Sequence, residues 1–181
     1  MLVVNLFGAP GAGKSTGAAY VFSMLKMLGV NAELVTEFAK DKVWEENKTA
    51  FDNHAYIFGE QFYRLSRLEG KVEVAITDSP LALSVLYNKN PILRQTFDDF
   101  VFDVASSYDS LNAFITRAKP YNNQGRRESE RESDLVSAEL IKLLKARDVA
   151  YETYSGNVEG YDLLVGDVLG RLGIVCGGLD L

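Results

Sequence analysis

Eight consecutive residues near the start of the chain have the spacing of a phosphate-binding loop. Residues 8–15 read Gly-Ala-Pro-Gly-Ala-Gly-Lys-Ser, a complete G-x-x-x-x-G-K-S pattern. Glycines permit the tight backbone turns that point successive N–H groups at phosphate oxygens. Lys14 is expected to bring a cation to the β- and γ-phosphates, and Ser15 a hydroxyl ligand for Mg²⁺. The predicted nucleotide-binding residues are Gly8, Ala9, Pro10, Gly11, Ala12, Gly13, Lys14, Ser15 and Thr16.

The segments on either side of residues 8–15 support this interpretation. Residues 2–7 form a mostly apolar run that suits a buried parallel strand. Residues 16–28 carry apolar side chains at helical spacing, and Gly29 is a good helix stop. The positive end of that helix dipole would add to the attraction for phosphate. The order of strand, loop and helix favours a nucleotide-binding loop over an accidental glycine-rich turn.

The rest of the chain alternates between strand-like and helix-like segments. Strands are predicted at 2–7, 32–35, 72–77, 111–116 and 149–154. Helices are predicted at 16–28, 51–68, 81–87, 91–106, 134–147 (capped by Asp134) and 158–172, with a short helix or loop at 38–47. This alternation predicts an α/β fold with a five-stranded parallel sheet and helices on both faces, the three-layer arrangement of P-loop NTPases. Ligands of such sheets bind beyond the carboxyl ends of the strands, so the polar residues after each strand are site candidates.

Asp78 follows the predicted strand at 72–77. A carboxylate there can hold the water shell of a Mg²⁺ ion that Ser15 ligates directly. The alternative is a turn or helix N-cap residue, which the following Ser79-Pro80 would favour.

Glu37 follows the predicted strand at 32–35. A carboxylate in that place faces the acceptor side of the cleft, where it could orient an attacking hydroxyl or accept its proton. The alternative is a solvated or helix-capping glutamate.

The predicted helix at 51–68 carries three polar side chains near one face. His54, Gln61 and Arg64 are offset by seven and then three residues. Gln61 offers a donor and an acceptor, which suits the edge of a base, and Arg64 could reach an anionic acceptor. For both, an ordinary exposed helix face is the alternative. His54 is the only histidine of the chain, and a structural or surface role is favoured for it.

A long polar segment at about 117–133 carries Arg126, Arg127 and Arg131. A loop of this length in a compact domain is usually functional or disordered. Phosphoryl transfer needs cations that close over the γ-phosphate and exclude water, so we predict a mobile arginine-bearing lid. The alternative is a solvated loop whose charges neighbouring glutamates balance.

The composition restricts the class of protein. The chain has 181 residues, of which 47% are hydrophobic, and a formal net charge of −6. This is enough for one domain with a normal core, and the acidic balance disfavours broad, non-specific nucleic-acid binding. The single cysteine, Cys176, cannot form an internal disulfide, which fits a reducing cytosol. No apolar run suits a membrane span, and the N-terminus lacks the basic region of a signal peptide, so we expect a cytoplasmic protein, in the host cytoplasm if viral.

Several classes of phosphate-loop protein lack their own motifs here. The chain has no Asn-Lys-x-Asp motif for guanine, and Asp78 is not part of an Asp-x-x-Gly switch, which disfavours a GTPase. A transporter signature is also absent from the sequence. The residues after Asp78 continue the alternation and do not form the separate helical domain of a ring-forming ATPase. Of the phosphate-loop classes considered, a small kinase is the one that remains.

Together these features resemble small P-loop kinases of the thymidylate kinase and deoxynucleoside kinase type. The resemblance rests on the phosphate loop, Thr36-Glu37-Phe38-Ala39-Lys40, Gln61, the Asp78-Ser79-Pro80 turn and the arginine lid. The Glu-Phe-Ala-Lys turn also resembles the nicotinamide riboside kinase group. The resemblance is closest to phage-encoded relatives, including those that phosphorylate 5-hydroxymethyl-deoxyuridine in viral DNA. It implies one P-loop kinase domain over residues 1–181 that uses ATP and Mg²⁺.

The resemblance also implies roles for the candidate residues. Glu37 would handle the acceptor hydroxyl, Gln61 the acceptor base, Asp78 the metal, and the lid arginines the transferred phosphoryl group. Thymidylate kinases usually carry Asp-Arg after the third strand, where the arginine helps to hold the phosphate of the acceptor. This chain has Asp78-Ser79 instead. A monophosphate acceptor would therefore need Arg64 or the lid to replace that cation.

The leading hypothesis is an ATP- and Mg²⁺-dependent kinase that phosphorylates a hydroxyl of a nucleoside or nucleotide. A hydroxymethylated pyrimidine in DNA, a free deoxynucleoside and a deoxynucleoside monophosphate all stay open as acceptors. A nucleotide-dependent switch or ATPase without an acceptor is an alternative from another class. A structural domain with a vestigial loop is a third, against which the intact Lys14-Ser15 pair argues. The oligomeric state is open, with a homodimer among the options.

Overall fold

The five strands of the computed structural model form one parallel sheet, as the alternation of the sequence predicts. The structure describes residues 1–88, 90–91, 93–122 and 129–174. Within these residues the strands run in the order β2-β3-β1-β4-β5. They are β1 (Leu2–Phe7), β2 (Ala32–Val35), β3 (Val74–Thr77), β4 (Asp109–Thr116) and β5 (Glu152–Ser155). All neighbouring strands pair in parallel, so their carboxyl ends share one edge of the sheet.

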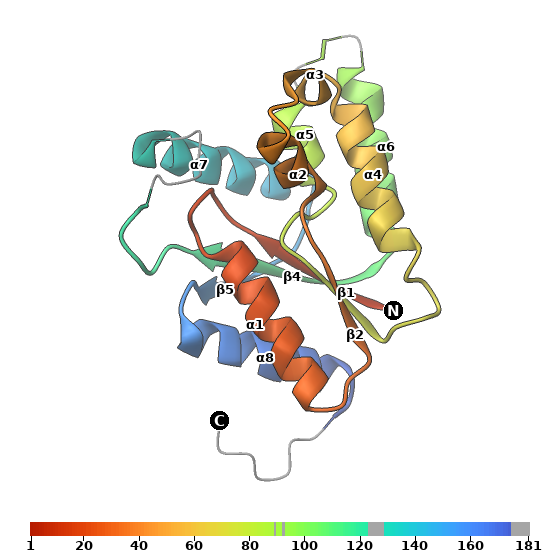
Figure 1. Cartoon of the computed structure of the whole chain (residues 1–181), viewed down its shortest axis with the longest axis vertical. Helices are drawn as coiled ribbons and strands as arrows, with labels where there is room; N and C mark the ends of the chain where they lie inside the picture. Colours follow the sequence, from red (N-terminus) through yellow and green to blue (C-terminus); the bar gives the residue numbers. More distant parts are fainter. Residues whose placement is uncertain (89, 92, 123–128, 175–181) are drawn as a thin grey trace.

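Helices cover both faces of this sheet (Figure 1). They are α1 (Lys14–Met27), α2 (Phe38–Trp44), α3 (Lys48–Phe51), α4 (His54–Ser66), α5 (Leu83–Tyr87), α6 (Arg94–Ser106), α7 (Glu130–Ala146) and α8 (Val158–Arg171). Helices α1 and α8 lie side by side on one face, while α4, α6 and α7 lie on the other. The predicted α/β fold, a three-layer P-loop NTPase fold, is confirmed.

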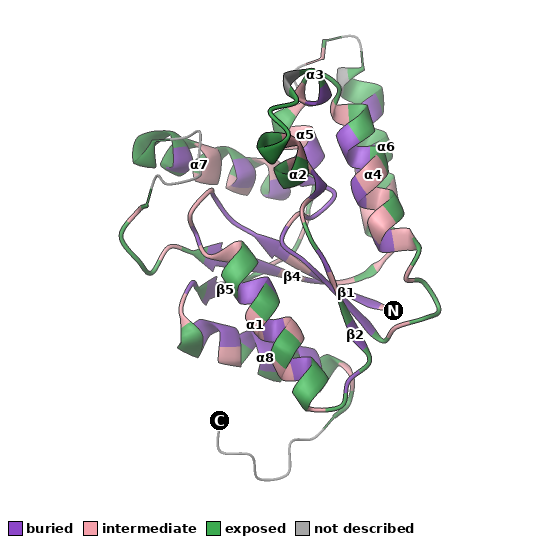
Figure 2. Cartoon of the chain, in the orientation of Figure 1, coloured by how far each residue is buried: buried purple, intermediate pink, exposed green. Residues whose placement is uncertain are grey.

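Alternation along β1 explains why both faces need helices. Leu2, Val4 and Leu6 pack with α1 and α8 in one apolar cluster. Val3 packs with α4 and α6, and Phe7 with α7, in two clusters on the opposite face. The central strands β1 and β3 are therefore almost fully buried (Figure 2), because a central parallel strand is covered on both sides.

The predicted helix at 51–68 begins three residues too early and ends two residues too late. Helix α3 ends at Phe51, and α4 begins at His54 after a break at Asp52-Asn53. The Asn53 side chain accepts a hydrogen bond from Tyr56 N at 3.2 Å and caps α4. Apolar periodicity alone does not reveal this break. The short N-cap side chain marks the true start.

The predicted cap of the helix at 134–147 is wrong. Helix α7 begins at Glu130, and its N-cap is Ser129 in place of Asp134. Ser129 Oγ accepts a hydrogen bond from Glu132 N, and the Glu132 carboxylate accepts one from Ser129 N at 2.7 Å. This reciprocal capping box satisfies two backbone groups at once, whereas Asp134 would satisfy one. The last residues of the predicted lid at 117–133 are therefore helical.

Smaller differences concern strand ends. Strand β3 begins at Val74, two residues later than predicted, and β4 begins at Asp109, two residues earlier. Strand β5 begins at Glu152 because Val149 and Tyr151 pack against α7 before the strand starts. In the part of the chain that the structure describes, every helix is too short or too polar to cross a membrane.

Candidate functional site

Three glycines bend the loop between β1 and α1. Gly8, Gly11 and Gly13 have φ angles of 145°, 86° and 106°, which L side chains rarely adopt. A Cβ atom on Gly8 would also lie 2.6 Å from the carbonyl oxygen of Ile115 on β4. Glycine at these positions is therefore a requirement of the backbone, as the phosphate-loop interpretation of the sequence expects.

Side chains of the loop itself and of α7 hold carbonyl groups of the loop. Lys14 Nζ donates to Gly8 O at 2.9 Å and to Ala9 O at 3.2 Å. Ser133 of α7, which is fully buried, donates to Pro10 O at 2.7 Å. With these carbonyls engaged by protein donors, the loop backbone is fixed before a ligand arrives.

Tyr161 of α8 holds the last turn of the loop. Its hydroxyl donates to Gly13 O at 2.9 Å, and its ring packs against the Cα of Gly17 so closely that a side chain there would clash. Burial raises the pKa of the Tyr161 hydroxyl above its ordinary value, so the group stays protonated and remains a donor.

The N-terminus of α1 is well suited to an anion. Gly13 occupies the N-cap position in a left-handed conformation and supplies no side-chain cap, and the first turn contains no acidic residue. The first N–H groups of α1 and the positive end of its dipole therefore point toward the loop. These are the features of a phosphate-binding helix terminus.

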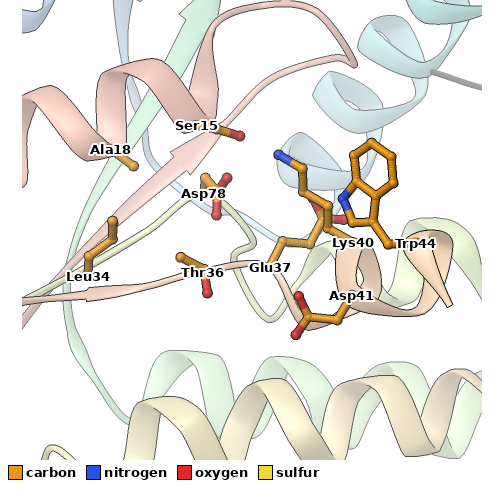
Figure 3. Close-up of a pocket in the computed structure, with 9 residues that line it drawn as sticks. All are labelled: Ser15, Ala18, Leu34, Thr36, Glu37, Lys40, Asp41, Trp44 and Asp78. Carbon is orange, nitrogen blue, oxygen red and sulfur yellow. The ribbon is translucent and has the colours of Figure 1, made fainter. Parts of the chain in front are cut away.

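A cavity of about 310 Å³ lies beside the phosphate loop. Its lining residues come from α1, from the end of β2, from α2 and from the end of β3 (Figure 3). They are Ser15, Ala18, Leu34, Thr36, Glu37, Lys40, Asp41, Trp44 and Asp78. In Figure 3, Lys40 and Trp44 of α2 face Ser15 and Asp78 across this space. The structure thus brings the predicted donor-side residues together with Glu37.

Asp78 and Ser15 lie at the phosphate-loop end of the cavity. Asp78 is 6% exposed, and its Oδ1 atom has no hydrogen-bond partner among the described residues. An unsatisfied buried carboxylate oxygen is costly unless a cation or water shell contacts it. Helix α5 begins later, at Leu83, so Asp78 is not a helix cap.

Ser15 and Asp78 suit a Mg²⁺ ion that is bound partly by water and phosphate better than a metal ion whose ligands all come from the protein. Within the described residues, no group of three or more His, Cys, Asp or Glu side chains could enclose an ion. Mg²⁺ usually binds through one or two protein oxygens, with water and substrate phosphates completing its shell. A hydroxyl and one buried carboxylate beside a phosphate loop match that pattern.

Glu37 lies at the turn between β2 and α2. It occupies the N-cap position of α2 but makes no side-chain capping hydrogen bond. Its backbone is extended there, with φ −63° and ψ 117°. The geometry therefore gives no support to the capping alternative, and the carboxylate lines the cavity. Its role in proton handling stays a prediction.

Gln61 and Arg64 lie on the far side of this turn, where they contact the protein itself. Gln61 is 3% exposed, and its Oε1 accepts from Phe38 N at 2.9 Å. Arg64 forms an ion pair with Asp41 at 2.6 Å, and its guanidinium lies 5.0 Å from the centroid of the Phe38 ring. Neither side chain lines the cavity. Their predicted contacts with an acceptor stay untested.

The predicted lid is described in part. Arg126 and Arg127 lie outside the described residues, and Arg131 is exposed in the first turn of α7. His54, at the start of α4, stacks on the Tyr87 ring with a centroid separation of 6.5 Å and does not line the cavity.

Arg117 is a candidate that the sequence analysis missed. It follows β4 directly and donates to Glu130 at 2.9 Å, to Ser133 Oγ at 2.9 Å and to Asp134 at 2.8 Å. It also lines a smaller cavity, of about 140 Å³, with Ala9, Ala12, Ile115, Asp134 and Ser137. The rule that selected Asp78 and Glu37, a polar residue just after a strand, would also have selected Arg117.

Trp44 and Tyr161 were also missed. The sequence leaves 38–47 open as helix or loop, so the single tryptophan of the chain had no assigned face. Trp44 is 73% exposed and lines the larger cavity. In the sequence, Tyr161 looks like an ordinary apolar position of the last helix. Its hydrogen bond to Gly13 joins residues far apart in sequence, so no local pattern could predict it.

Comparisons with known proteins place the chain in a family. The family model described as AAA domain matches residues 3–160. The chain therefore belongs to the AAA domain family and is a P-loop nucleotide-binding domain. No curated protein matches the sequence.

Two solved structures share the fold at low sequence identity. NadR protein in complex with NR has a TM-score of 0.74 at 15% identity, over 99% of this chain and 52% of the NadR chain. Thymidylate kinase from Ehrlichia chaffeensis has a TM-score of 0.58 at 14% identity, over 94% of this chain and 98% of its own. The chain thus spans about half the length of NadR. These likenesses show the fold alone.

Replacing Lys14 tests the phosphate loop. Lys14→Ala removes the cation expected at the β- and γ-phosphates and should weaken ATP binding about 10- to 100-fold, the loss expected for a charge-assisted hydrogen bond. Isothermal titration with ATP measures the change. Lys26→Ala, which alters an exposed lysine in the last turn of the same helix, should bind ATP as the wild type does. Equal affinity of all three proteins would refute the loop assignment.

Proposed function

We propose that this P-loop domain is an ATP-dependent kinase that transfers the γ-phosphate to a hydroxyl of a small, ring-bearing acceptor of the nucleoside type. The observation that carries this proposal is the cavity of about 310 Å³ that adjoins the phosphate loop. One cavity contains Ser15 and Asp78 at one end and Glu37, Lys40 and Trp44 at the other. A nucleotide switch needs the first set of residues but has no use for the second.

The donor side would hold ATP mainly through the backbone. The loop N–H groups and Lys14 would bind the β- and γ-phosphates, and Lys14 would exchange its bonds to Gly8 O and Ala9 O for phosphate oxygens. Ser15 and Asp78 would hold Mg²⁺, which supplies charge neutralisation at the phosphate oxygens when bound. Arg117, next to Ala9 and Ala12 in the smaller cavity, offers a further cation on the other side of the loop.

The acceptor side would position one hydroxyl for in-line attack. The oxygen of that hydroxyl forms a bond to the γ-phosphorus while the bond from phosphorus to the β,γ-bridging oxygen breaks, and ADP leaves. Glu37 would orient the hydroxyl and receive its proton. Because phosphoryl transfer proceeds through a loose transition state, positioning and charge neutralisation would supply most of the catalysis.

The lining residues favour a neutral ring-bearing acceptor over a monophosphate. Trp44 presents an indole that is 73% exposed at the cavity, a surface on which a heterocyclic ring can stack. Among the described lining residues Lys40 is the only cation, and Arg64 is already bound to Asp41. An added phosphate group would need more positive charge than this end of the cavity holds.

The similar folds add support at the level of substrate class. NadR was solved in complex with NR, and the other similar structure is a thymidylate kinase. A hydroxymethylated pyrimidine in DNA, suggested by the resemblance to phage-encoded kinases, shares the ring and the hydroxyl but adds a strand that must leave the cavity. It belongs in the same test as a separate acceptor.

Transfer of labelled γ-phosphate from ATP tests the proposal. The wild-type chain would be given free nucleosides, nucleoside monophosphates, and DNA with or without 5-hydroxymethyl-deoxyuridine. We expect labelled product with at least one nucleoside and slower or no transfer to monophosphates. If only hydroxymethylated DNA were phosphorylated, the proposed acceptor would be a modified base in DNA and not a free nucleoside. Slow release of inorganic phosphate with every acceptor would leave an ATPase or switch, and the kinase proposal would fail.

Changing Glu37 tests the acceptor side. Glu37→Gln keeps the size of the side chain but removes the proton acceptor, so turnover should fall about 100-fold or more while ATP affinity stays as it is. Steady-state kinetics with the accepted nucleoside and ATP titration measure the two effects. Glu33→Gln, an exposed change on β2 outside the cavity, serves as the control. A loss of ATP affinity alone would place Glu37 on the donor side.

Changing Trp44 tests the ring-stacking surface. Trp44→Ala should raise the acceptor KM about 5- to 100-fold, because a base–aromatic stack contributes about 1–3 kcal/mol. Trp44→Phe retains an aromatic face and should raise the acceptor KM much less. Val43→Ala, on the same helix but outside the cavity, should leave the KM unchanged. An unaltered KM in Trp44→Ala would remove Trp44 from the acceptor site.

A further inference from the structure

The side chain of Gln61 forms hydrogen bonds on both sides of Glu37. Its Oε1 accepts from the N–H of Phe38 at 2.9 Å, and its Nε2 donates to the carbonyl of Thr36 at 3.4 Å. A carboxamide carries the same donor and acceptor as a peptide group, so it can pair with backbone as a neighbouring strand does. One side chain on α4 thus forms hydrogen bonds with the backbone immediately before and after Glu37.

The same amide also reaches the strand that carries Asp78. Gln61 Nε2 donates to Thr77 Oγ1 at 3.5 Å, and Thr77 Oγ1 accepts from Ser79 N at 3.1 Å. Thr77 is 2% exposed and directly precedes Asp78. Gln61 therefore contacts the backbone on both sides of Glu37 and also contacts Thr77, the residue before Asp78.

Burial makes this amide an unusual choice for its position. Gln61 is 3% exposed on α4, whose other buried residues are Ile57, Phe58 and Leu65. An apolar side chain would pack there without the cost of desolvating an amide. The strand β2 ends at Val35 and α2 starts at Phe38, so the backbone between them lacks regular partners. Gln61 supplies partners to Phe38 N and Thr36 O, and Arg64 also donates to Thr36 O at 3.4 Å.

We propose that Gln61 is a positioning residue that sets Glu37 relative to Asp78. This inference rests on the proposed kinase function, in which these two carboxylates lie on the acceptor and metal sides of one cavity. It replaces contact with an acceptor base as the role of Gln61, because the amide is already engaged by Phe38, Thr36 and Thr77. A displacement of about 1 Å at a reacting group can cost about 100-fold in rate, so this fixation matters for turnover.

Gln61→Met removes the amide and keeps the length of the side chain. We expect kcat to fall about 100-fold, as a displacement of Glu37 would cause, while the KM for ATP stays unchanged. Phe62→Leu is the matched control, since Phe62 packs against the apolar cluster that α4 forms with α6 and the sheet and does not line the cavity. Unfolding in urea shows how much each variant is destabilised.

A second measurement is independent of activity. Hydrogen exchange of the Phe38 amide, followed by NMR, should become faster in Gln61→Met than in Phe62→Leu, because only the first change removes its acceptor. If Gln61→Met does not fold, Gln61→Asn provides a shorter amide that cannot span the same partners and should lose turnover similarly.

The outcomes separate the two proposals. Equal kcat losses in Gln61→Met and Phe62→Leu, at similar destabilisation, would overturn the positioning role. A rise in the ATP KM of Gln61→Met without a fall in kcat would overturn it as well. If the wild type transfers phosphate to no acceptor, the kinase function fails. The exchange rate of Phe38 then decides by itself whether Gln61 fixes the turn around Glu37.

Discussion

The bent backbone of the phosphate loop is the constraint on which the rest of the structure depends. Its positive φ angles at Gly8, Gly11 and Gly13 are strained for any other residue, and they hold only if the surrounding protein supports them. The support comes from Ser133 on α7 at Pro10 and from Tyr161 on α8 at Gly13. Both faces of the sheet therefore contribute a helix whose side chain fixes the loop.

The two sides of the candidate site are built differently. The proposed donor side consists mainly of backbone and a helix terminus between β1 and α1, at the carboxyl end of a central strand. The acceptor side consists of side chains on α2, a short helix that Gln61 and Arg64 fasten to α4. Backbone geometry leaves little freedom for chemical variation, whereas α2 can present different side chains on the same support. Specificity for an acceptor would therefore reside mainly in α2 and its turn.

Local patterns predicted the parts of the molecule that are set by neighbouring residues. The strand, loop and helix at the N-terminus and the edge strand at Ala32–Val35 follow from short apolar runs and glycine stops. The same patterns misplaced the starts of α4 and α7, because a capping side chain can set where a helix begins without changing the apolar stripe.

Long-range contacts explain what the sequence could not reveal. Ser133 meets Pro10 across the phosphate loop, and Gln61 reaches the turn at Phe38, in each case between elements that only the fold brings together. An exposed helix face was one reading of Gln61, yet the side chain is buried. The sequence showed which residue types could do chemistry, and the packing decided which of them face the cavity.

The charges around the cavity follow from that packing and bear on the acceptor. Arg64 pairs with Asp41 from outside the cavity, and a metal ion at Asp78 would neutralise the buried carboxylate of that residue. Glu37 and Lys40 then remain as one negative and one positive group at the acceptor end. A nearly balanced end beside an exposed indole attracts an uncharged ring more than an anion, because an anion would lose hydration without a matching cation. The charge that the proposed acceptor would meet thus depends in part on the ion pair between Arg64 and Asp41.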